Sequence, residues 1–596
     1  MKLKEIDKNI TIYYDIDFNK NIFNMDLGNH ADNWPVTYIL YNRSKGKAYV
    51  GETTSFKTRM GNHLEDSSKN EYTKALFIDY NQATKSTILH LEAFLIRGLS
   101  ISHELLSDLS NIKANSNKHT YYNEQKDEEM CIKVWNALKD EVGIVKEYYN
   151  TIRNKNEFKY SPYILLNENQ NEVLNEIIDE LCYKDNNMIV IEGASGTGKS
   201  AVAIQLFKQL TSYNNFNGII DNSMVGENIN RLYDIKNKFN KNGNYYSIAY
   251  VAPMSNFCSI IRKSINKIQG LKKKDLKENK TYINDDDLNM MRLYSGSDLK
   301  KLAKHVSKDN KLFDLIIVDE AQRLNRRYNQ SNGNGYLAFD EMNKALGLPV
   351  NKNKDDGNQL DWIFELSKNQ VFFYDKRQTI RSSDVPTEYF KNKFKNATFR
   401  KTLLAEERCL GGTEYIDYVN AIFSNTPPKE KKIFNNYEFE IFDKYEDMIK
   451  ALETKEDDLS IKASGYFFQS TDDNYDIEVD GIKQRWNQVA YDWINNKVRK
   501  ENEIGCIHVL EGVDADYVGV IVGDEIKYED GKIKVEEDNY KDKLGKTCID
   551  SEDQLLQYIT NVYYILLTRA MKGTYLYVMD PTMKEYLEKY INKKEN

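Results

Sequence analysis

One eight-residue stretch constrains the fold of this 596-residue chain more than any other feature: Gly193-Ala194-Ser195-Gly196-Thr197-Gly198-Lys199-Ser200. It fits the pattern G-x-x-x-x-G-K-[ST], and it lies between the apolar run at 188–191 and a helical pattern. Glycines let successive backbone N–H groups curve around an anion at a helix N-terminus, so the loop is suited to phosphate groups. We expect Lys199 to place its cation on the β- and γ-phosphates and Ser200 to bind Mg²⁺ through its hydroxyl. The stretch therefore predicts a nucleotide-binding α/β domain.

Two carboxylates, Asp319 and Glu320, follow a second apolar run at 315–318. Ligands of parallel α/β sheets bind at the carboxyl ends of the strands, which is where this pair is expected. We expect Asp319 to hold Mg²⁺ and Glu320 to polarise the water that attacks the γ-phosphate. Alone, the pair would equally suit an acidic turn at a strand end. Downstream of the phosphate loop, it predicts nucleotide hydrolysis.

From residue 168 onward, short apolar runs alternate with helical patterns. The runs lie at 188–191, 247–253, 314–320, 370–375, 515–523 and 574–580. Such alternation is typical of parallel α/β sheets, and the chain is too long for a single hydrophobic core. We therefore predict two α/β segments, at 163–400 and 401–596, after a first domain at 1–115 and a polar connector at 116–162.

Composition narrows the possible settings. The 83 basic and 91 acidic residues give a net charge of −8, which argues against a histone-like binder but leaves room for a locally basic channel. The six cysteines form no C-x-x-C pair, so neither a zinc knuckle nor a disulfide framework is expected. No apolar run reaches the roughly 18–20 residues of a membrane helix, and the N-terminus has no signal core. We expect a cytoplasmic protein without a membrane partner.

The order of motifs between 170 and 570 resembles that of superfamily 1 helicases. The matching positions are Gln170, Ala252–Ser255, Asp319–Gln322, Asp375 with Gln378, Arg408, His508–Asp514 with Tyr517, and Thr568–Ala570. The wording at 372–381 and 564–577 looks closest to the bacterial branch related to Schlafen helicase domains. One position departs from the pattern, since Glu511 stands where the family usually has Gln.

This resemblance implies two RecA-like parallel α/β lobes with ATP and Mg²⁺ between them. In the family, the residues matched by Gln170 and Gln378 read the adenine and sense the γ-phosphate. The arginines matched by Arg408 and Arg569 place positive charge on the γ-phosphate during hydrolysis. ATP-driven closure of the lobes would then move a single nucleic-acid strand across both of them.

A second resemblance lies near the N-terminus, where two predicted strands at 36–42 and 47–52 precede helices near 55–64 and 85–98. VTYILYN and AYVGETTSFKTRMGNH are similar to the two halves of the GIY-YIG nuclease domain, with Val36 and Thr37 in place of Gly-Ile. The matched residues are Tyr38, Tyr49, Arg59, His63 and Glu92. The family's late asparagine corresponds to Asn111, Asn115 or Asn117. The implied fold is a small α+β domain ahead of the two lobes.

The chemistry of these residues suits cleavage of a phosphodiester. One carboxylate, Glu92, with water ligands suits Mg²⁺, and Mn²⁺ is a second candidate. Arg59 offers a planar fork to phosphate oxygens, and it shares a helix face with His63 at spacing i, i+4. His63 or a tyrosine would serve as general base. Separately, Glu92 would also suit a solvent-facing helix position, and Tyr38 and Tyr49 would suit core packing.

Two other features carry weaker signals. The Lys-rich stretch at 262–280 suits either a phosphate-binding tract or a solvated loop, and the loop is the simpler interpretation. Trp486 and Trp493 lie seven apart, which predicts one helix and core packing rather than base stacking.

Together the motifs predict an ATP-dependent helicase or translocase joined to a metal-dependent endonuclease. DNA is a likelier substrate than RNA on this hypothesis, and fusions of this layout point to bacterial defence against phage. The alternatives are a repair or recombination enzyme, and an ATP-switched DNA-binding protein whose nuclease module does not cut. The sequence does not indicate the oligomeric state.

Overall fold

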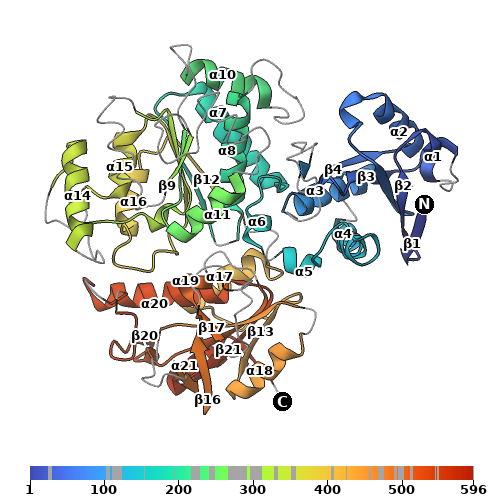
Figure 1. Ribbon diagram of the computed structural model, residues 1–596. Helices are drawn as coiled ribbons and strands as arrows, with labels where there is room; N and C mark the ends of the chain where they lie inside the picture. Colours follow the sequence, from blue (N-terminus) through green and yellow to red (C-terminus); the bar gives the residue numbers. More distant parts are fainter. Residues whose placement is uncertain are drawn as a thin grey trace. The chain divides into compact units, whose positions relative to one another are not determined.

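The structure is a computed structural model that describes residues 1–24, 30–101, 108–109, 124–153, 155–194, 196–215, 228–239, 248–265, 291–294, 312–327, 333–350, 357–404, 409–424, 426–455, 458–466, 475–488, 493, 503–510, 515–543, 545–546 and 549–594. The chain divides into two compact units. The first is formed by Met1–Asn175 with the shorter stretches Ile204–Asp234 and Lys263–Asp275, and the second by Glu176–Ala203, Ile235–Arg262 and Leu276–Asn596. The first runs from blue to teal in Figure 1, and most of the second runs from green to red.

A six-stranded sheet lies at the centre of the first unit, in the order β1-β2-β5-β3-β4-β6. Its bounds are β1 Lys2–Asp7, β2 Ile10–Asp17, β3 Val36–Asn42, β4 Lys47–Thr53, β5 Lys74–Tyr80 and β6 Asp108–Leu109. The helices of this unit are η1 Lys20–Asn24, α1 His30–Asn33, α2 Phe56–Glu65, η2 Ser67–Lys69, α3 Lys85–Ile101, α4 Glu124–Ala137, η3 Leu138–Val142, α5 Tyr149–Ile152 and α6 Asn156–Lys159. The predicted order strand, turn, strand, helix is confirmed by β3, β4 and α2, whereas β1, β2 and β5 were not predicted.

Strand alternation divides the side chains of β3 between two cores. Tyr38 and Leu40 pack with Phe56 of α2, on one face of the sheet. Ile39 and Tyr41 pack on the other face, in the core that holds α3 and α4. The helix that carries Arg59 and His63 is therefore held against the same sheet face as Tyr38.

The segment predicted as a connector contributes helices to the first domain. Val134 and Trp135 of α4, and Phe158 of α6, are buried in the core that also contains α3. Trp135 Nε1 donates a hydrogen bond to the carbonyl of Glu147 at 2.9 Å, which ties α4 to the turn before α5. The segment is rich in charged residues, and only a few of its apolar side chains face the core. Its composition therefore does not indicate that it contributes to the core.

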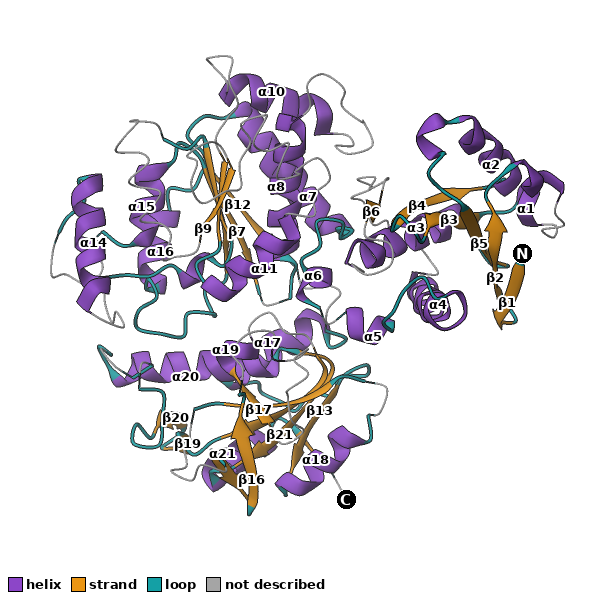
Figure 2. Cartoon of the chain, viewed as in Figure 1, coloured by secondary structure: helices purple, strands orange, loops and turns teal. Residues whose placement is uncertain are grey.

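The second unit contains two sheets, here called lobe 1 and lobe 2. The sheet of lobe 1 is wholly parallel, in the order β12-β7-β11-β10-β8-β9. Its bounds are β7 Met188–Gly193, β8 Ile248–Val251, β9 Met291–Tyr294, β10 Leu315–Val318, β11 Gln370–Tyr374 and β12 Phe399–Leu403. The helices are α7 Glu168–Tyr183, α8 Lys199–Asn215, α10 Ile229–Phe239, α11 Ser255–Ile265, η6 Ala321–Arg323, α14 Gly333–Leu346, α15 Gln359–Leu366 and α16 Thr387–Phe394. Figure 2 shows α8 on one side of this sheet and α15 and α16 on the other.

Lobe 2 has an eight-stranded sheet in the order β15-β16-β17-β14-β18-β21-β13-β22 and a separate hairpin, β19-β20. Its bounds are β13 Glu438–Phe442, β14 Ser460–Ser464, β15 Ile477–Val479, β16 Ile482–Trp486, β17 Glu503–Cys506, β18 Ala515–Val522, β19 Ile526–Glu529, β20 Lys532–Val535, β21 Ala570–Val578 and β22 Asn592–Lys593. The helices are α17 Gly412–Ile422, α18 Tyr445–Glu453, α19 Ile507–Leu510, α20 Glu552–Leu567 and α21 Pro581–Glu588. Side chains of α17 and α20 share one core with the sheet, and α18 belongs to the other.

The predicted fold class is confirmed: a small N-terminal α+β domain precedes two parallel-sheet, RecA-like α/β lobes. The predicted helix across Trp486 and Trp493 is wrong at its start, because Trp486 is the last residue of strand β16. Trp493 is 2 % exposed, so the expected core packing holds there. No helix in the described part of the chain combines the length and apolar character needed to span a membrane.

Candidate nucleotide and nuclease sites

The phosphate loop connects β7 to α8, at the carboxyl edge of the lobe 1 sheet. Gly196 and Gly198 have φ angles of 84° and 85°, a left-handed conformation that glycine adopts without strain. Gly193 leaves room for Thr197, since a Cβ at Gly193 would lie 2.5 Å from the Thr197 hydroxyl oxygen. That hydroxyl donates to the carbonyl of Ala194 at 3.1 Å. Gly196 and Gly198 therefore supply the backbone conformation of the loop, and Gly193 supplies the space for Thr197.

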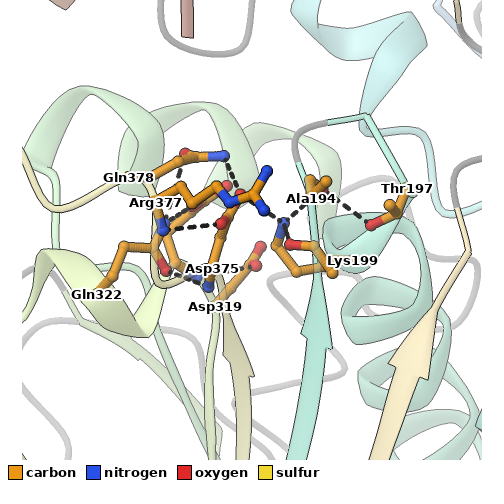
Figure 3. Close-up of polar contacts among 10 residues, drawn as sticks. Ala194, Thr197, Lys199, Asp319, Gln322, Asp375, Arg377 and Gln378 are labelled. Atoms are coloured by element: carbon orange, nitrogen blue, oxygen red, sulfur yellow. Dashed lines mark hydrogen bonds and ion pairs between the residues drawn. The ribbon is translucent and has the colours of Figure 1, made fainter. Parts of the chain in front are cut away.

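Lys199, the first residue of α8, is held inside this loop. Its Nζ donates to the carbonyl oxygens of Gly193 and Ala194, at 2.8 and 2.9 Å. It also lies 3.8 Å from Asp375 Oδ2, with both side chains 4 % exposed. Figure 3 shows Lys199 between the loop and the carboxylates that follow β10 and β11. The cation is thus surrounded by oxygen atoms that phosphate oxygens could replace.

Asp319, directly after β10, lies fully buried beside the loop. Tyr250 of β8 donates its hydroxyl to Asp319 Oδ2 at 2.8 Å, and the Ser200 hydroxyl also hydrogen-bonds this carboxylate. Burial, with a smaller contribution from the Glu320 carboxylate, raises the pKa of Asp319 to about 7, against the opposing effect of these hydrogen bonds and Lys199. A buried carboxylate beside a hydroxyl is a donor set that Mg²⁺ accepts. Ser200 and Asp319 therefore fit the metal role predicted for them.

A polar network joins the strand ends of β10 and β11. Glu320 has a φ of 54°, an uncommon left-handed conformation for a residue with a side chain. Gln322 Nε2 donates to Glu320, and at 3.4 Å to Gln378 Oε1, while Gln322 Oε1 accepts from the Asp375 backbone N–H at 3.0 Å. Gln378 Nε2 in turn donates to Asp375 Oδ2 at 2.9 Å. The network joins Glu320 to Asp375 through Gln322, and Figure 3 shows Gln322 and Gln378 beside Asp375, which lies next to Lys199.

Residues 377–381 of lobe 1 contact lobe 2 through three interactions. Asn561 of α20 donates to the carbonyl of Thr379 at 2.8 Å. The Arg377 guanidinium lies 5.2 Å from the ring centroid of Tyr564, also on α20. The third contact joins Arg381 Nη2 to His508 Nε2 at 2.5 Å. The segment next to Gln378 is therefore in direct contact with the helix that ends just before Arg569.

Burial and two nearby guanidiniums determine the charge of His508. They lower the pKa of His508 to about 2, so the ring is neutral and accepts the hydrogen bond from Arg381. The cost of an unpaired buried imidazolium is thereby avoided.

Two motif residues of lobe 2, Arg569 and Tyr517, are described by their burial and by contacts within that lobe. Arg569 is 6 % exposed, and its Nε has no hydrogen-bond partner among the described groups. No described contact joins Arg569 to Lys199. Tyr517 donates to Glu438 Oε1 at 2.9 Å within lobe 2.

Gln170 occupies the first turn of α7. It forms a reciprocal cap with Asn167, since the Asn167 backbone N–H donates to Gln170 Oε1 at 3.1 Å and the Gln170 N–H donates to Asn167 Oδ1 at 2.8 Å. The following predicted positions lie outside the described residues: Asn111, Asn115, Asn117, 266–280, Arg408 and 511–514.

In the nuclease domain, three predicted residues share one hydroxyl group. The Tyr38 hydroxyl oxygen lies 2.7 Å from His63 Nε2 and accepts a hydrogen bond from Arg59 Nε at 3.2 Å. Burial, and less strongly the neighbouring Tyr49, raises the pKa of Tyr38 far above its usual value. The hydroxyl therefore keeps its proton, and the direction of its hydrogen bond with His63 Nε2 follows the tautomer of the imidazole.

The hairpin register explains the glycine of the second half. Tyr38 pairs with Gly51 across β3 and β4. A Cβ at Gly51 would lie 2.3 Å from the Tyr38 hydroxyl oxygen, so the tyrosine ring reaches His63 only because Gly51 has no side chain.

Tyr49 is the centre of a second group of contacts. The Arg59 guanidinium hydrogen-bonds its hydroxyl, and His63 lies edge-on to its ring at 5.1 Å between centroids. Lys69 Nζ lies 3.8 Å from the centroid of the same ring. Tyr49 is 6 % exposed whereas Tyr38 is 0 % exposed, so Tyr49 alone of the two tyrosines retains some access to solvent.

Glu92 projects from α3 and is 4 % exposed. Its carboxylate contributes to the upward shift in the pKa of Tyr38, which brings it into the same group of residues as Arg59. The described residues contain no cluster of three metal-ligating side chains. Mg²⁺ often retains several waters and takes one or two carboxylates together with substrate phosphates. A single buried carboxylate therefore fits a divalent metal that is completed by water and substrate.

Sequence reasoning missed several residues of these sites. Tyr250 and Gln322 orient the carboxylates of lobe 1, and Lys69 contacts Tyr49 in the nuclease domain. Gln322 lies within a quoted motif and could have been assigned a role there. Tyr250 and Lys69 reach the sites only through folding, and their sequence neighbourhoods carry no signal.

Comparisons with known families agree with this geometry. The profile of the Schlafen group 3 DNA/RNA helicase domain matches residues 186–580, and that of the GIY-YIG catalytic domain matches residues 35–97. The uncharacterized protein YPL245W of Saccharomyces cerevisiae is 23 % identical over 441 residues, which cover 67 % of this chain and 83 % of the yeast protein.

Two solved structures are also similar to this chain. A DEAD box protein from the hyperthermophile Methanococcus jannaschii has a TM-score of 0.29 at 12 % identity, and the match covers 76 % of this chain and 98 % of that one. A variant of S. cerevisiae Dbp5 in a complex containing ADP has a TM-score of 0.29 at 11 % identity, with 70 % and 86 % covered. The fold assignment rests on the sheet orders described above.

Proposed function

The chain belongs to the family of the Schlafen group 3 DNA/RNA helicase domain, and from this premise we propose that it is an ATP-driven nucleic-acid motor whose GIY-YIG domain cuts nucleic acid. One observation supports the motor above all others. Lys199, Asp319, Asp375 and Gln378 come from three strand ends of one sheet and form a single buried polar group.

In the proposed hydrolysis, Lys199 exchanges its carbonyl contacts for oxygens of the β- and γ-phosphates. Glu320, held by Gln322, orients the attacking water. Ser200 and Asp319 would hold Mg²⁺, which when bound supplies positive charge against the phosphates. Arg569, together with Arg408, would add cations from the second half of the chain, as in the related helicases.

The network around Gln378 offers a route from the nucleotide to lobe 2. Gln378 bonds Asp375, which faces Lys199, and the next residue, Thr379, accepts a hydrogen bond from α20. A change in the γ-phosphate contacts would thereby be felt at α20 and at Arg569 beyond it.

In the proposed cleavage, Arg59 donates to the oxygens of the scissile phosphate. Glu92 would hold Mg²⁺ or Mn²⁺, which when bound polarises that phosphate. We assign the proton of the attacking water to Tyr49 in its phenolate form, after its own proton has left to solvent beside the Arg59 guanidinium, because Tyr38 and His63 are hydrogen-bonded to each other. Tyr38 and His63 are then positioning residues that hold Arg59 and Tyr49.

For the substrate we propose DNA, and for the biological role the destruction of invading DNA. A motor joined to an endonuclease suits long polymers, because movement along the strand brings many phosphodiesters to a single cutting site. A repair role would use the same chemistry at lesions, and RNA remains an outcome of the test below.

The experiment measures both activities in the same tubes. The full chain is mixed with ATP, Mg²⁺ or Mn²⁺, and single-stranded DNA, duplex DNA or RNA, and both phosphate release and product sizes are followed. We expect DNA to stimulate ATP hydrolysis and to be cut, and EDTA to stop both reactions.

A matched pair of variants tests the nuclease assignment. Glu92→Gln should reduce cleavage at least about 100-fold, whereas Glu71→Gln, which loses only an ion pair to Lys47, should cut like the parent. Preferential stimulation and cutting with RNA would replace DNA as the substrate. Intact nucleic acid in every tube would leave the chain without its proposed nuclease activity.

A further inference from the structure

Lys69 is a cation of the nuclease domain to which the cleavage chemistry assigns no role. It is the last residue of η2, the short turn that follows α2, and its side chain is half-buried. Its Nζ lies 3.8 Å from the centroid of Tyr49 and 6.0 Å from that of Tyr72. Lys69 therefore lies on the ring of the residue to which we assign the proton of the attacking water.

The charges around Lys69 are unbalanced. No described carboxylate forms an ion pair with Lys69 or with Arg59, whereas Lys47, at the start of β4, is paired with Glu71. Burial lowers the pKa of Lys69, Asp66 opposes this shift, and the Arg59 guanidinium adds to it. Two cations are thus held near each other across tyrosine groups, an arrangement that favours an anion.

Arg59 and Lys69 are more exposed to solvent than Tyr38 and His63. Tyr38 and His63 are 0 % and 5 % exposed, while Arg59 and Lys69 are both half-buried. An incoming nucleic-acid strand would therefore meet the two cations before it met the tyrosine–histidine pair. Arg59 donates to both tyrosine hydroxyls and keeps further N–H groups for the scissile phosphate, while no described hydrogen bond engages the ammonium of Lys69.

We propose that Lys69 is a phosphate-positioning residue of the nuclease site, which binds a backbone phosphate next to the scissile one and holds the strand against Tyr49. The chemistry it recognises is the phosphodiester backbone, independent of base identity. This assignment rests on the proposed nuclease function. A purely structural alternative exists, in which Lys69 only stabilises the Tyr49 ring through a cation–π contact.

Salt dependence separates the two roles. A residue that neutralises one phosphate displaces counterions, so its removal reduces the slope of log rate against log salt by about 0.9 for duplex DNA. A residue that only supports the Tyr49 ring would lower the rate equally at every salt concentration. The slope therefore reports on phosphate contact and is insensitive to local packing.

The test uses the full chain and a labelled duplex DNA, with single-turnover cleavage followed at subsaturating enzyme between about 50 and 200 mM salt. Lys69→Met keeps the apolar stem and should cut about tenfold more slowly at low salt, with the reduced slope. Lys69→Arg should restore both rate and slope. Lys47→Met, which removes a paired cation, should match the parent.

The outcomes are distinguishable. A parent chain that cuts, with Lys69→Met equal to it in rate and slope, contradicts the proposal while leaving the nuclease function intact. A lower rate with an unchanged slope also contradicts it, in favour of the structural role. A parent chain that does not cut removes the nuclease function and this proposal together. If Lys69→Met unfolds the nuclease domain, as judged by a lost or strongly lowered thermal transition, Lys69→Gln carries the same test.

Discussion

In the phosphate loop, Lys199 donates to two backbone carbonyls and lies 3.8 Å from Asp375, whereas in the nuclease domain Arg59 and Lys69 face tyrosine hydroxyls and rings. The first cation is surrounded by oxygen atoms and carboxylates. Arg59 and Lys69 form no ion pair with a described carboxylate. Both regions are built to meet phosphate, but they hold their positive charge in different ways.

This difference has a physical consequence. A phosphate that reaches Lys199 replaces existing oxygen contacts, so the gain is the difference between two sets of interactions, and nearby carboxylates make an added Mg²⁺ necessary. A phosphate that reaches Arg59 and Lys69 relieves repulsion between cations. We infer that the nucleotide site selects for a complete metal–nucleotide complex, while the nuclease site attracts any phosphate backbone.

The largest predicted effect concerns Lys199, the cation of the nucleotide site in lobe 1. Lys199→Met removes the cation and should reduce ATP hydrolysis at least about 100-fold, because charge developing on the γ-phosphate loses its main protein partner. Lys208 is an apt control, since it is equally buried on the same helix and donates to the carbonyl of Pro162 at 3.0 Å. Lys208→Met should retain hydrolysis. Equal loss in both variants would mean that burial of a lysine in α8, and not contact with phosphate, explains the result.

A smaller effect is expected from steric pressure on the nuclease site. Gly51→Ala places a Cβ 2.3 Å from the Tyr38 hydroxyl oxygen, so the ring must move away from His63 and Arg59. We predict a loss of cleavage of about 10- to 100-fold, with ATP hydrolysis unchanged.

Gly98→Ala provides the matched clash in the same domain. There a Cβ would lie 2.3 Å from the ring of Trp135, a core residue to which we assign no role in either site. It should lower the thermal stability by about 1–3 kcal/mol and leave cleavage by the folded fraction intact. If Gly98→Ala reduces specific cleavage as much as Gly51→Ala does, the displacement of Tyr38 is not the cause.

The smallest effect concerns a third arrangement of a buried cation. Lys208 has a carbonyl partner and the face of Tyr163 at 4.8 Å, and burial lowers its pKa to about 7. In the unfolded chain Lys208 keeps its proton up to a pKa of about 10.4, whereas in the folded chain it loses that proton near pH 7. The free energy of unfolding therefore rises as the pH increases from 7 toward 10. Between pH 7 and about 9.5, the parent should gain up to about 3 kcal/mol that Lys208→Met does not gain. Thermal unfolding at the two pH values measures this, and parallel curves for both proteins would refute it.

Much of this architecture could be predicted from local pattern. The phosphate loop, the Asp319–Glu320 pair and the strands around them were located by apolar runs and fixed spacings. The structure places the loop after β7 and the pair after β10, in one sheet with β11 between them. The nuclease hairpin and its helix were predicted in the same way. These features depend on residues that are close in sequence, where periodicity and turn chemistry are most informative.

What escaped prediction depends on contacts between distant segments. Tyr250 meets Asp319 only because β8 and β10 are neighbours in the sheet, an order that the sequence does not state. Trp135 and its helix enter the nuclease core although the segment is highly charged. Strand β16, which ends at Trp486, is too short for its period to be distinguished from that of a helix.

The most direct test of two separate phosphate-handling sites is a comparison of Glu92→Gln, Lys199→Met and the double variant, with ATP hydrolysis and cleavage of a short labelled duplex DNA read from the same reactions. The account predicts that Glu92→Gln loses cleavage and keeps hydrolysis, that Lys199→Met loses hydrolysis and keeps metal-dependent cleavage of the short substrate, and that the double variant loses both. Cleavage that survives Glu92→Gln but disappears with Lys199→Met would contradict it, because the cutting would then belong to the nucleotide site.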